Sequence, residues 1–166
     1  GEFDPLRSKI IMYDAAFEKD DKFLLGIMAH EVQHSNWAQY KRQAIKEFET
    51  LRMLKTEEHN QYATIKGGKF SLTPAGQKQF PALALDRYFI ATQNERLFIK
   101  QDGISAYSAS HWAEYKTKRG RVPEGILTPI NETLAEVARI EAIGNIESVP
   151  KFWRDLYKKV RKSHAR

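Results

Sequence analysis

The amino-acid sequence predicts a mainly helical α+β fold with a small sheet. Apolar residues recur every three or four positions over several long stretches, a spacing typical of amphipathic helices, and Lys9-Ile10-Ile11-Met12-Tyr13 is a short apolar run typical of a strand. With 166 residues, the chain is long enough to form a core of its own. We therefore interpret residues 1–166 as one domain, in which Gly1-Glu2-Phe3 is typical of a cloning scar.

The first long helix is expected directly after this strand. Acidic residues at positions 20–21 suit its N-terminus, where the helix dipole is positive, and the helix then enters the run His30-Glu31-Val32-Gln33-His34. Past this run the apolar spacing continues to Leu51, so the helix either goes on or restarts at positions 35–36. We expect the side away from the histidines to be buried; it carries Leu25, Met28, Ala29 and Val32.

Turn and cap signals divide the middle of the chain. Gly67-Gly68 is typical of a turn, and Thr73-Pro74 indicates the start of a helix that Pro81 breaks. Residues 82–100 have the spacing of one long helix. Residues 104–128 are rich in serine and are expected to be irregular.

Two further helices are predicted near the C-terminus. Thr128-Pro129 repeats the helix-start signal for a helix that reaches about Ile143, with Gly144 just after its end. Ser148-Val149-Pro150 then opens the last helix. A basic cluster gathers on and after it, formed by Lys158, Lys159, Arg161, Lys162 and Arg166.

Composition narrows the classes of partner and site. The net charge is +6, but a basic helix face is more often solvated than bound and no nucleic-acid motif accompanies it, so no nucleic-acid partner is expected. The longest apolar runs are far too short to span a membrane. The chain has no cysteine, which excludes disulfides and Cys-rich zinc sites and fits both a cytoplasmic and an exported protein. Nothing in the sequence indicates an oligomeric state.

The run from His30 to His34 contains the residues that indicate a catalytic metal site. On a helix that turns about 100° per residue, the two histidines lie one above the other, about 40° apart. Two imidazoles so placed can hold one Zn²⁺ ion. Glu31 lies on the flank, where it can take a proton from a zinc-bound water as that water attacks a carbonyl. The pattern is typical of a zinc metallopeptidase, with Zn²⁺ as cofactor and a protein or peptide as substrate.

A catalytic zinc ion needs a third protein ligand. Glu132 and Glu136 lie one turn apart on one face of the helix predicted after Thr128, so that Glu132 would bind the ion and Glu136 would hydrogen-bond a ligand imidazole. Glu136 is itself an alternative ligand. Further candidates for the third ligand are Glu57, Glu58 and His59. Their distance from His34 along the sequence is close to the shorter spacing of thermolysin-type sites.

The order of these motifs resembles that of the lethal-factor-like zincin peptidases, a gluzincin-type family. His30, Glu31 and His34 are followed by Ile104-Ser105-Ala106-Tyr107 and then by Asn131-Glu132-Thr133-Leu134-Ala135-Glu136. The family includes the anthrax lethal factor catalytic domain and the clostridial Pro-Pro endopeptidases. The order of elements is shared over nearly the whole chain, while the close matches cover about fifteen residues.

The resemblance implies a zincin-like fold in which residues 9–13 form an edge strand for an extended substrate, and it favours a secreted or delivered toxin or effector. It also implies that Tyr107 stabilises the oxyanion, a role that suits a phenol donor. In this chain Tyr107 precedes Glu132 by 25 positions, much further than in the family. Tyr115 and His111 therefore remain rivals for that role.

The leading hypothesis is a zinc-dependent endopeptidase in which His30, His34 and Glu132 bind the ion and Glu31 is the general base. Two hypotheses from other classes stay open. One is a catalytically silent zincin-like binding module, and the other is a basic nucleic-acid-binding domain with a structural metal. The sequence does not indicate which peptide bond would be cleaved.

Overall fold

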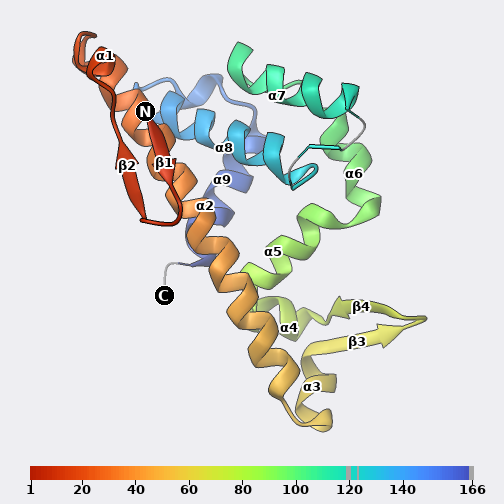
Figure 1. Cartoon of the computed structure of the whole chain (residues 1–166). Coiled ribbons are helices and arrows are strands. Elements are labelled where there is room, and N and C mark those ends of the chain that lie inside the picture. The colour runs from red at the N-terminus through yellow and green to blue at the C-terminus, as the bar shows by residue number, and fades with distance from the viewer. Residues whose placement is uncertain (119–120, 123, 165–166) are drawn as a thin grey trace.

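Helices dominate the fold (Figure 1). The computed structural model describes residues 1–118, 121–122 and 124–164. In this part of the chain the strands form two separate antiparallel pairs, β1 with β2 and β3 with β4. The prediction of a mainly helical α+β fold with little sheet is confirmed, although the strands form two small sheets rather than one.

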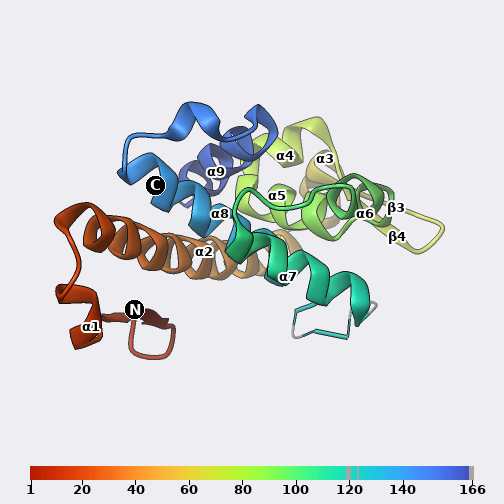
Figure 2. The ribbon, with the colours of Figure 1, turned by 90° about the horizontal axis from the view of Figure 1, so that it is seen from above.

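The longest element is α2 (Asp21–Met53), which runs along the whole molecule (Figures 1 and 2). Its N-cap is Asp20, whose carboxylate accepts a hydrogen bond from the backbone N–H of Phe23 at 2.8 Å. The helix continues through His34 without a break, so the alternative of a restart at positions 35–36 is wrong. At 1.5 Å per residue, its length is about 50 Å.

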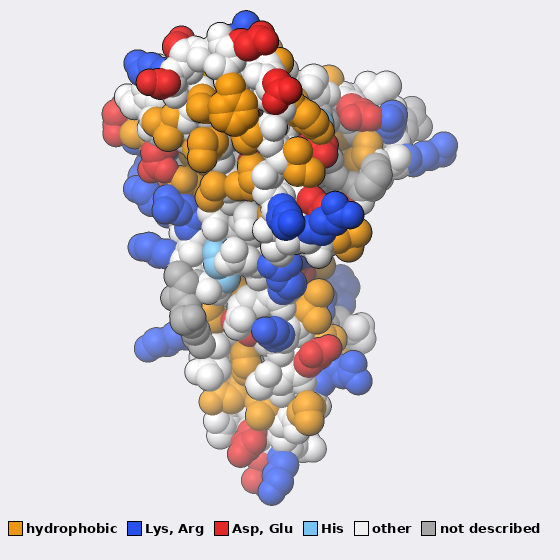
Figure 3. All heavy atoms as spheres, turned by 60° about the vertical axis from the view of Figure 1, so that its left-hand side comes forward, with side chains coloured by type: hydrophobic (Ala, Val, Ile, Leu, Met, Phe, Trp, Pro, Cys, Tyr) orange, Lys and Arg blue, Asp and Glu red, His pale blue; other side chains and the backbone are white. Residues whose placement is uncertain are grey.

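The buried side of α2 is not the predicted one. Leu25 is 50% exposed, and Met28 and Val32 are each 45% exposed; of the predicted stripe, Ala29 alone packs against the core. The prediction fails because the histidines themselves face the packed side of the helix, where Gly26, Gln33, Trp37, Tyr40 and Ala44 are buried. Figure 3 shows hydrophobic side chains gathered at the surface near the end of the molecule where α2 begins.

The N-terminal segment forms the first small sheet beside α2. Strand β1 (Glu2–Asp4) pairs with β2 (Lys9–Ile11), with Phe3 opposite Ile10. The predicted strand over residues 9–13 is thus confirmed for its first three residues. A short helix, α1 (Asp14–Phe17), then leads into α2.

The second sheet lies at the far end of α2 (Figure 1). Helix α3 (Thr56–Tyr62) leads to β3 (Ala63–Lys66) and β4 (Lys69–Leu72), which the sequence analysis did not predict. The predicted turn at Gly67-Gly68 joins them, with φ values of +56° and +73°. A second, smaller core holds this end together and consists of Leu51, Ala63, Phe80 and Leu83.

The middle of the chain contains more helix than predicted. Thr73 caps α4 (Pro74–Gln79), and Pro81 begins α5 (Pro81–Ile90), as expected. The single helix predicted over residues 82–100 is wrong, because Ala91 has an extended backbone and separates α5 from α6 (Thr92–Ile99).

The segment predicted to be irregular, residues 104–128, instead contains a helix, α7 (Ala106–Thr117). It begins with a capping box in which Ser105 and Ser108 each hydrogen-bond the other's backbone N–H. The serines that suggested loop are therefore helix-start residues, since Ser at the N-cap stabilises a first turn.

The central element is α8 (Leu127–Ala142), which packs between α2, α7 and α9 (Figures 1 and 2). It begins at Leu127 after the N-cap Ile126, so the start predicted from Thr128-Pro129 is two residues too late. Gly144 follows the helix with φ +87°, as predicted. Trp112 of α7 donates a buried hydrogen bond to Thr133 of α8 at 2.9 Å, which fixes α7 beside it.

The last elements are a 3₁₀ turn, η1 (Ile146–Ser148), and α9 (Lys151–Ser163). The basic residues at positions 158, 159, 161 and 162 are all exposed, whereas Arg166 lies outside the described residues. No helix in the described part of the chain combines the length and apolar character needed to cross a bilayer.

Candidate metal centre

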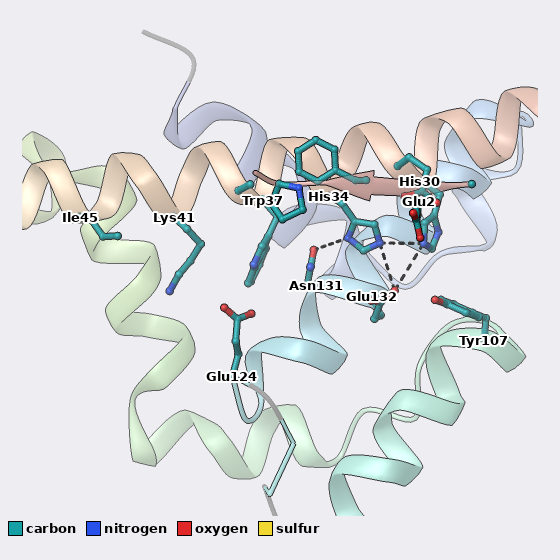
Figure 4. A pocket seen from close by; sticks show the side chains of 15 residues that line it. Glu2, His30, His34, Trp37, Lys41, Ile45, Tyr107, Glu124, Asn131 and Glu132 are labelled. Carbon is teal, nitrogen blue, oxygen red and sulfur yellow. Dashed lines mark hydrogen bonds and ion pairs between the residues drawn. The ribbon is translucent and has the colours of Figure 1, made fainter. Parts of the chain in front are cut away.

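Two imidazoles and one carboxylate converge between α2 and α8 (Figure 4). The Nε2 atoms of His30 and His34 are 3.2 Å apart, and Glu132 Oε2 lies 3.7 Å from the first and 3.5 Å from the second. Among the residues that the structure describes, this is the one group of three or more such side chains whose ligand atoms lie close enough together to hold a metal ion. The structure thus brings together the three side chains that the sequence analysis favoured as ligands, His30, His34 and Glu132.

The spacing of the three atoms suits a small divalent cation. Atoms at these separations surround a point about 2.0 Å from each of them, which is the length of a zinc bond to imidazole nitrogen or carboxylate oxygen. Glu132 Oε2 is buried and has no hydrogen-bond partner in the described structure. A buried carboxylate oxygen without a donor is costly, and a cation at this point would satisfy it.

The other nitrogen of each histidine is held by α8. His30 Nδ1 lies 3.0 Å from Glu136 Oε1, and His34 Nδ1 lies 3.2 Å from Asn131 Oδ1. Since both of these oxygens are acceptors, each Nδ1 carries the proton and each Nε2 presents a lone pair. The two rings are therefore oriented as ligands, with outer partners of the kind that metal-binding histidines use.

Glu136 is the most strongly perturbed group at the site. It is 3% exposed, and burial raises its pKa, but hydrogen bonds with His30, Arg139 and Ser105 outweigh burial and lower its pKa to about 2. Glu136 is thus a carboxylate at any ordinary pH, and a hydrogen-bond acceptor for His30.

Glu132 and His34 influence one another. Burial raises the pKa of Glu132, but the imidazole of His34, 3.5 Å from Oε2, outweighs burial and leaves the pKa lowered. Burial lowers the pKa of His34, and its contacts with Glu132 and Asn131 outweigh that effect and leave the pKa raised. His34 and Glu132 therefore each favour the charged form of the other.

A cavity of about 650 Å³ opens onto the three ligand atoms. Its wall includes Glu31, which is 6% exposed and follows His30 on α2. On the other side of the cavity lies β1, through Glu2 and Phe3, so the strand beside the site is β1 rather than residues 9–13. A molecule in this cavity would contact both the ligand cluster and Glu31.

Of the three proposed oxyanion donors, Tyr107 lies nearest the cluster. Its ring lies edge-on to that of His30 at 5.5 Å, and it lines the cavity (Figure 4). Burial, followed by the charge of Glu132, raises the pKa of Tyr107 to about 12, so the phenol keeps its proton. The ring of His111 lies edge-on to that of Tyr107 at 4.9 Å, whereas the hydroxyl of Tyr115 donates a hydrogen bond to Glu95 of α6.

The competing third ligands lie elsewhere. Glu57, Glu58 and His59 are on α3, beyond the C-terminus of α2. Because α2 is one straight run to Met53, they are separated from His34 by about 28 Å of helix. The structure thus brings Glu132 and Glu136 to the histidines and keeps this second group apart from them.

Two residues of the site were not singled out by the sequence analysis. Asn131 orients His34, and its position directly before Glu132 was the available signal. Arg139 forms a two-point contact with Glu136, and the feature that could have indicated it was its spacing of three positions from Glu136 on one helix.

Comparison of the chain with protein-family models, curated proteins and solved structures finds no match. The functional argument therefore depends on the residues of the site.

Proposed function

We propose that this protein is a zinc-dependent endopeptidase whose ion is held by His30, His34 and Glu132. The observation that carries the proposal is the buried, donor-free oxygen of Glu132 facing two histidine nitrogens in a cavity that also contains Glu31. Three protein ligands leave a fourth position open, as catalytic zinc sites do. Two histidines one turn apart, with Glu31 directly after the first and a carboxylate as third ligand, are the ligand pattern of zinc peptidases, and this pattern favours zinc here.

The chain's own residues would divide the chemistry among them. When bound, a zinc ion supplies a Lewis acid that lowers the pKa of a coordinated water. Glu31, which lines the same cavity, would take the proton of the attacking water and pass it to the leaving amine. The protonated phenol of Tyr107 would donate a hydrogen bond to the carbonyl oxygen as negative charge develops on it.

The shape of the cavity favours cleavage within a chain. Besides the ligand cluster, the cavity is lined by successive turns of α2 through Trp37, Lys41 and Ile45. From His30 to Ile45 this wall is about 22 Å long, enough for about six residues of extended peptide. An extended substrate could therefore lie along α2 on one side of the site, as an endopeptidase that binds several residues beside the cleaved bond requires.

We further propose that the chain is a distant member of the lethal-factor-like zincin peptidases. The support is the order of the motifs together with the meeting of His30, His34, Glu132 and Tyr107 in one place. The long separation between Tyr107 and Glu132 in the sequence is compatible with their nearness, because α7 runs outward and α8 returns to the same end.

The proposal is tested by metal analysis combined with a peptide-library cleavage assay. The parent protein should hold about one zinc per chain, and Glu31→Gln should keep the ion while cleavage falls by orders of magnitude, because the amide cannot accept the proton. Glu49→Gln, an exposed glutamate on the same helix, is the matched control and should cleave like the parent. Zinc binding without cleavage by any protein in the set would instead indicate a binding module.

A further inference from the structure

Arg139 holds the carboxylate of Glu136 at two points. Its Nε lies 3.0 Å from Oε1 and 3.1 Å from Oε2, and its Nη2 lies 3.0 Å from Oε2. Oε1 is also the atom that accepts from His30 Nδ1 at 3.0 Å. Because the planar guanidinium fork contacts both oxygens, it fixes the plane of the carboxylate and not merely its position.

Gly26 of α2 gives Arg139 the room for this contact. A Cβ atom at position 26 would lie 3.1 Å from Arg139 Cγ and 3.4 Å from Ile143 Cγ2. The first distance is tighter than ordinary packing, so a side chain at position 26 would push the arginine stem away from α2. Gly26 is itself buried and lies one helical turn before His30.

We propose that Arg139 is a positioning residue for the metal centre, acting on His30 through Glu136, and that Gly26 keeps its place open. This inference rests on the proposed metal site. The chain of contacts runs in series from guanidinium to carboxylate to imidazole, and it ends at the nitrogen opposite the ligand atom of His30. Without the fork, Glu136 can rotate and the imidazole loses its fixed orientation toward the ion.

The alternative role for Arg139 is a direct contact with substrate. Its side chain is 35% exposed and lines a smaller cavity of about 200 Å³ next to His30 and Tyr107. The two roles predict different measurements. A positioning residue changes the affinity for the metal in the absence of substrate, whereas a substrate contact changes KM and leaves metal affinity alone.

The decisive experiment is a double-mutant cycle on zinc affinity, measured by competition with a chromophoric chelator. Arg139→Ala should weaken zinc binding about tenfold, the lower end of the range for outer partners of metal ligands, and Arg139→Lys should recover part of the loss. In the Glu136→Ala background, Arg139→Ala should have no further effect on zinc affinity, because the contact that links Arg139 to His30 is already lost. Arg154→Ala removes an arginine–glutamate pair on the side of the molecule formed by η1 and α9, and as the matched control it should bind zinc like the parent.

A second variant tests whether Arg139 acts on His30 through Glu136, without removing the arginine. Gly26→Ala should weaken zinc binding several-fold in the parent and leave it unchanged in the Arg139→Ala background. The metal-free variant should still unfold in one cooperative transition above the assay temperature, which shows that it remains folded. A loss of fold is thereby distinguished from a loss of positioning.

Three outcomes would overturn the inference. They are unchanged zinc affinity in Arg139→Ala, an equal loss in the parent and Glu136→Ala backgrounds, and a change confined to KM. Each of these leaves the proposed peptidase standing, because the parent still binds zinc. A parent protein that binds no zinc overturns the proposed function and this inference together.

Discussion

Two carboxylates at the two ends of α2 have opposite surroundings: Glu47 within its distal half and Glu132 of α8 beside its proximal half. In the distal half, Glu47 is 5% exposed and both of its oxygens have donors: the backbone N–H of Leu83 at 2.8 Å and the side chain of Gln43 at 3.2 Å. Beside the proximal half, Glu132 presents an oxygen that has no donor and faces His30 and His34.

This difference separates a structural carboxylate from a candidate ligand. The N–H of Leu83 is one of the unpaired amides at the start of α5, which has no side-chain cap of its own, so Glu47 serves as that cap from another helix. Burial of a glutamate is therefore not by itself a sign of function. The informative feature at the other end is an oxygen left without a partner beside two oriented imidazoles.

The largest effect should follow from Glu132→Ala. Removal of the charged ligand should weaken zinc binding at least about 1000-fold, well beyond the 10–100-fold cost of losing an outer partner. Saturating zinc should then no longer raise the melting temperature, whereas it should raise that of the parent. Calorimetry with and without zinc measures both; equal zinc affinity in parent and variant would remove Glu132 from the ligand set.

Acid should destabilise the metal-free protein through Glu136. The pKa of Glu136 is about 2 in the folded protein against an ordinary value of 4.5, so its contribution is fully present above the ordinary value and is lost as the pH falls through about 2. The shift corresponds to roughly 3 kcal/mol. Urea unfolding between pH 5 and pH 2 should show this loss in the parent and a flatter profile in Glu136→Gln; parallel profiles would contradict it.

The distal carboxylate should affect stability without affecting metal binding. Glu47→Ala leaves a buried backbone N–H without a partner and should lower the free energy of unfolding by about 1–3 kcal/mol. Zinc affinity measured below the unfolding transition should match that of the parent. A change in zinc affinity would mean that the two ends of α2 are energetically coupled and that the role of Glu47 is not structural alone.

The smallest effect should come from α3, where Glu58 is exposed and His59 is half-buried. Both lie far from His30 and His34, so Glu58→Ala and His59→Ala should each change stability by less than about 0.5 kcal/mol and leave zinc affinity unaltered. Loss of zinc in Glu58→Ala would instead support the thermolysin-type spacing and overturn the assignment of Glu132.

What could be predicted from the sequence depended on how local the determining interactions are. The relation between His30 and His34 follows from the helical repeat alone, and so does that between Glu132 and Glu136. The helix starts at Thr73-Pro74 and Pro81 also follow from local chemistry. By contrast, the roles of Asn131 and Arg139 exist only because α8 crosses α2 at this place.

The errors have the same origin. The stripe with Leu25 and Met28 was expected to be buried because it is apolar, yet the position of α8 decides which face of α2 is covered. Likewise, the periodicity of residues 82–100 continues across Ala91 because Phe89 and Phe98 pack on each other at 5.8 Å in the folded chain. The pattern shows which residues enter the core, but it does not show where the backbone turns between them.

The contacts that orient the two histidines join very distant parts of the chain. His30 and Glu136 are 106 positions apart, and His34 and Asn131 are 97 positions apart. Closing loops of this length costs about 4 kcal/mol of chain entropy before any contact compensates, and contacts so far apart in sequence slow folding. An isolated peptide spanning α2 would contain every residue of the His30–His34 motif, but both rings would turn freely in it. During refolding, the paired orientation of the imidazoles therefore arises only when α2 and α8 dock, so the environment of these rings reports the completion of folding.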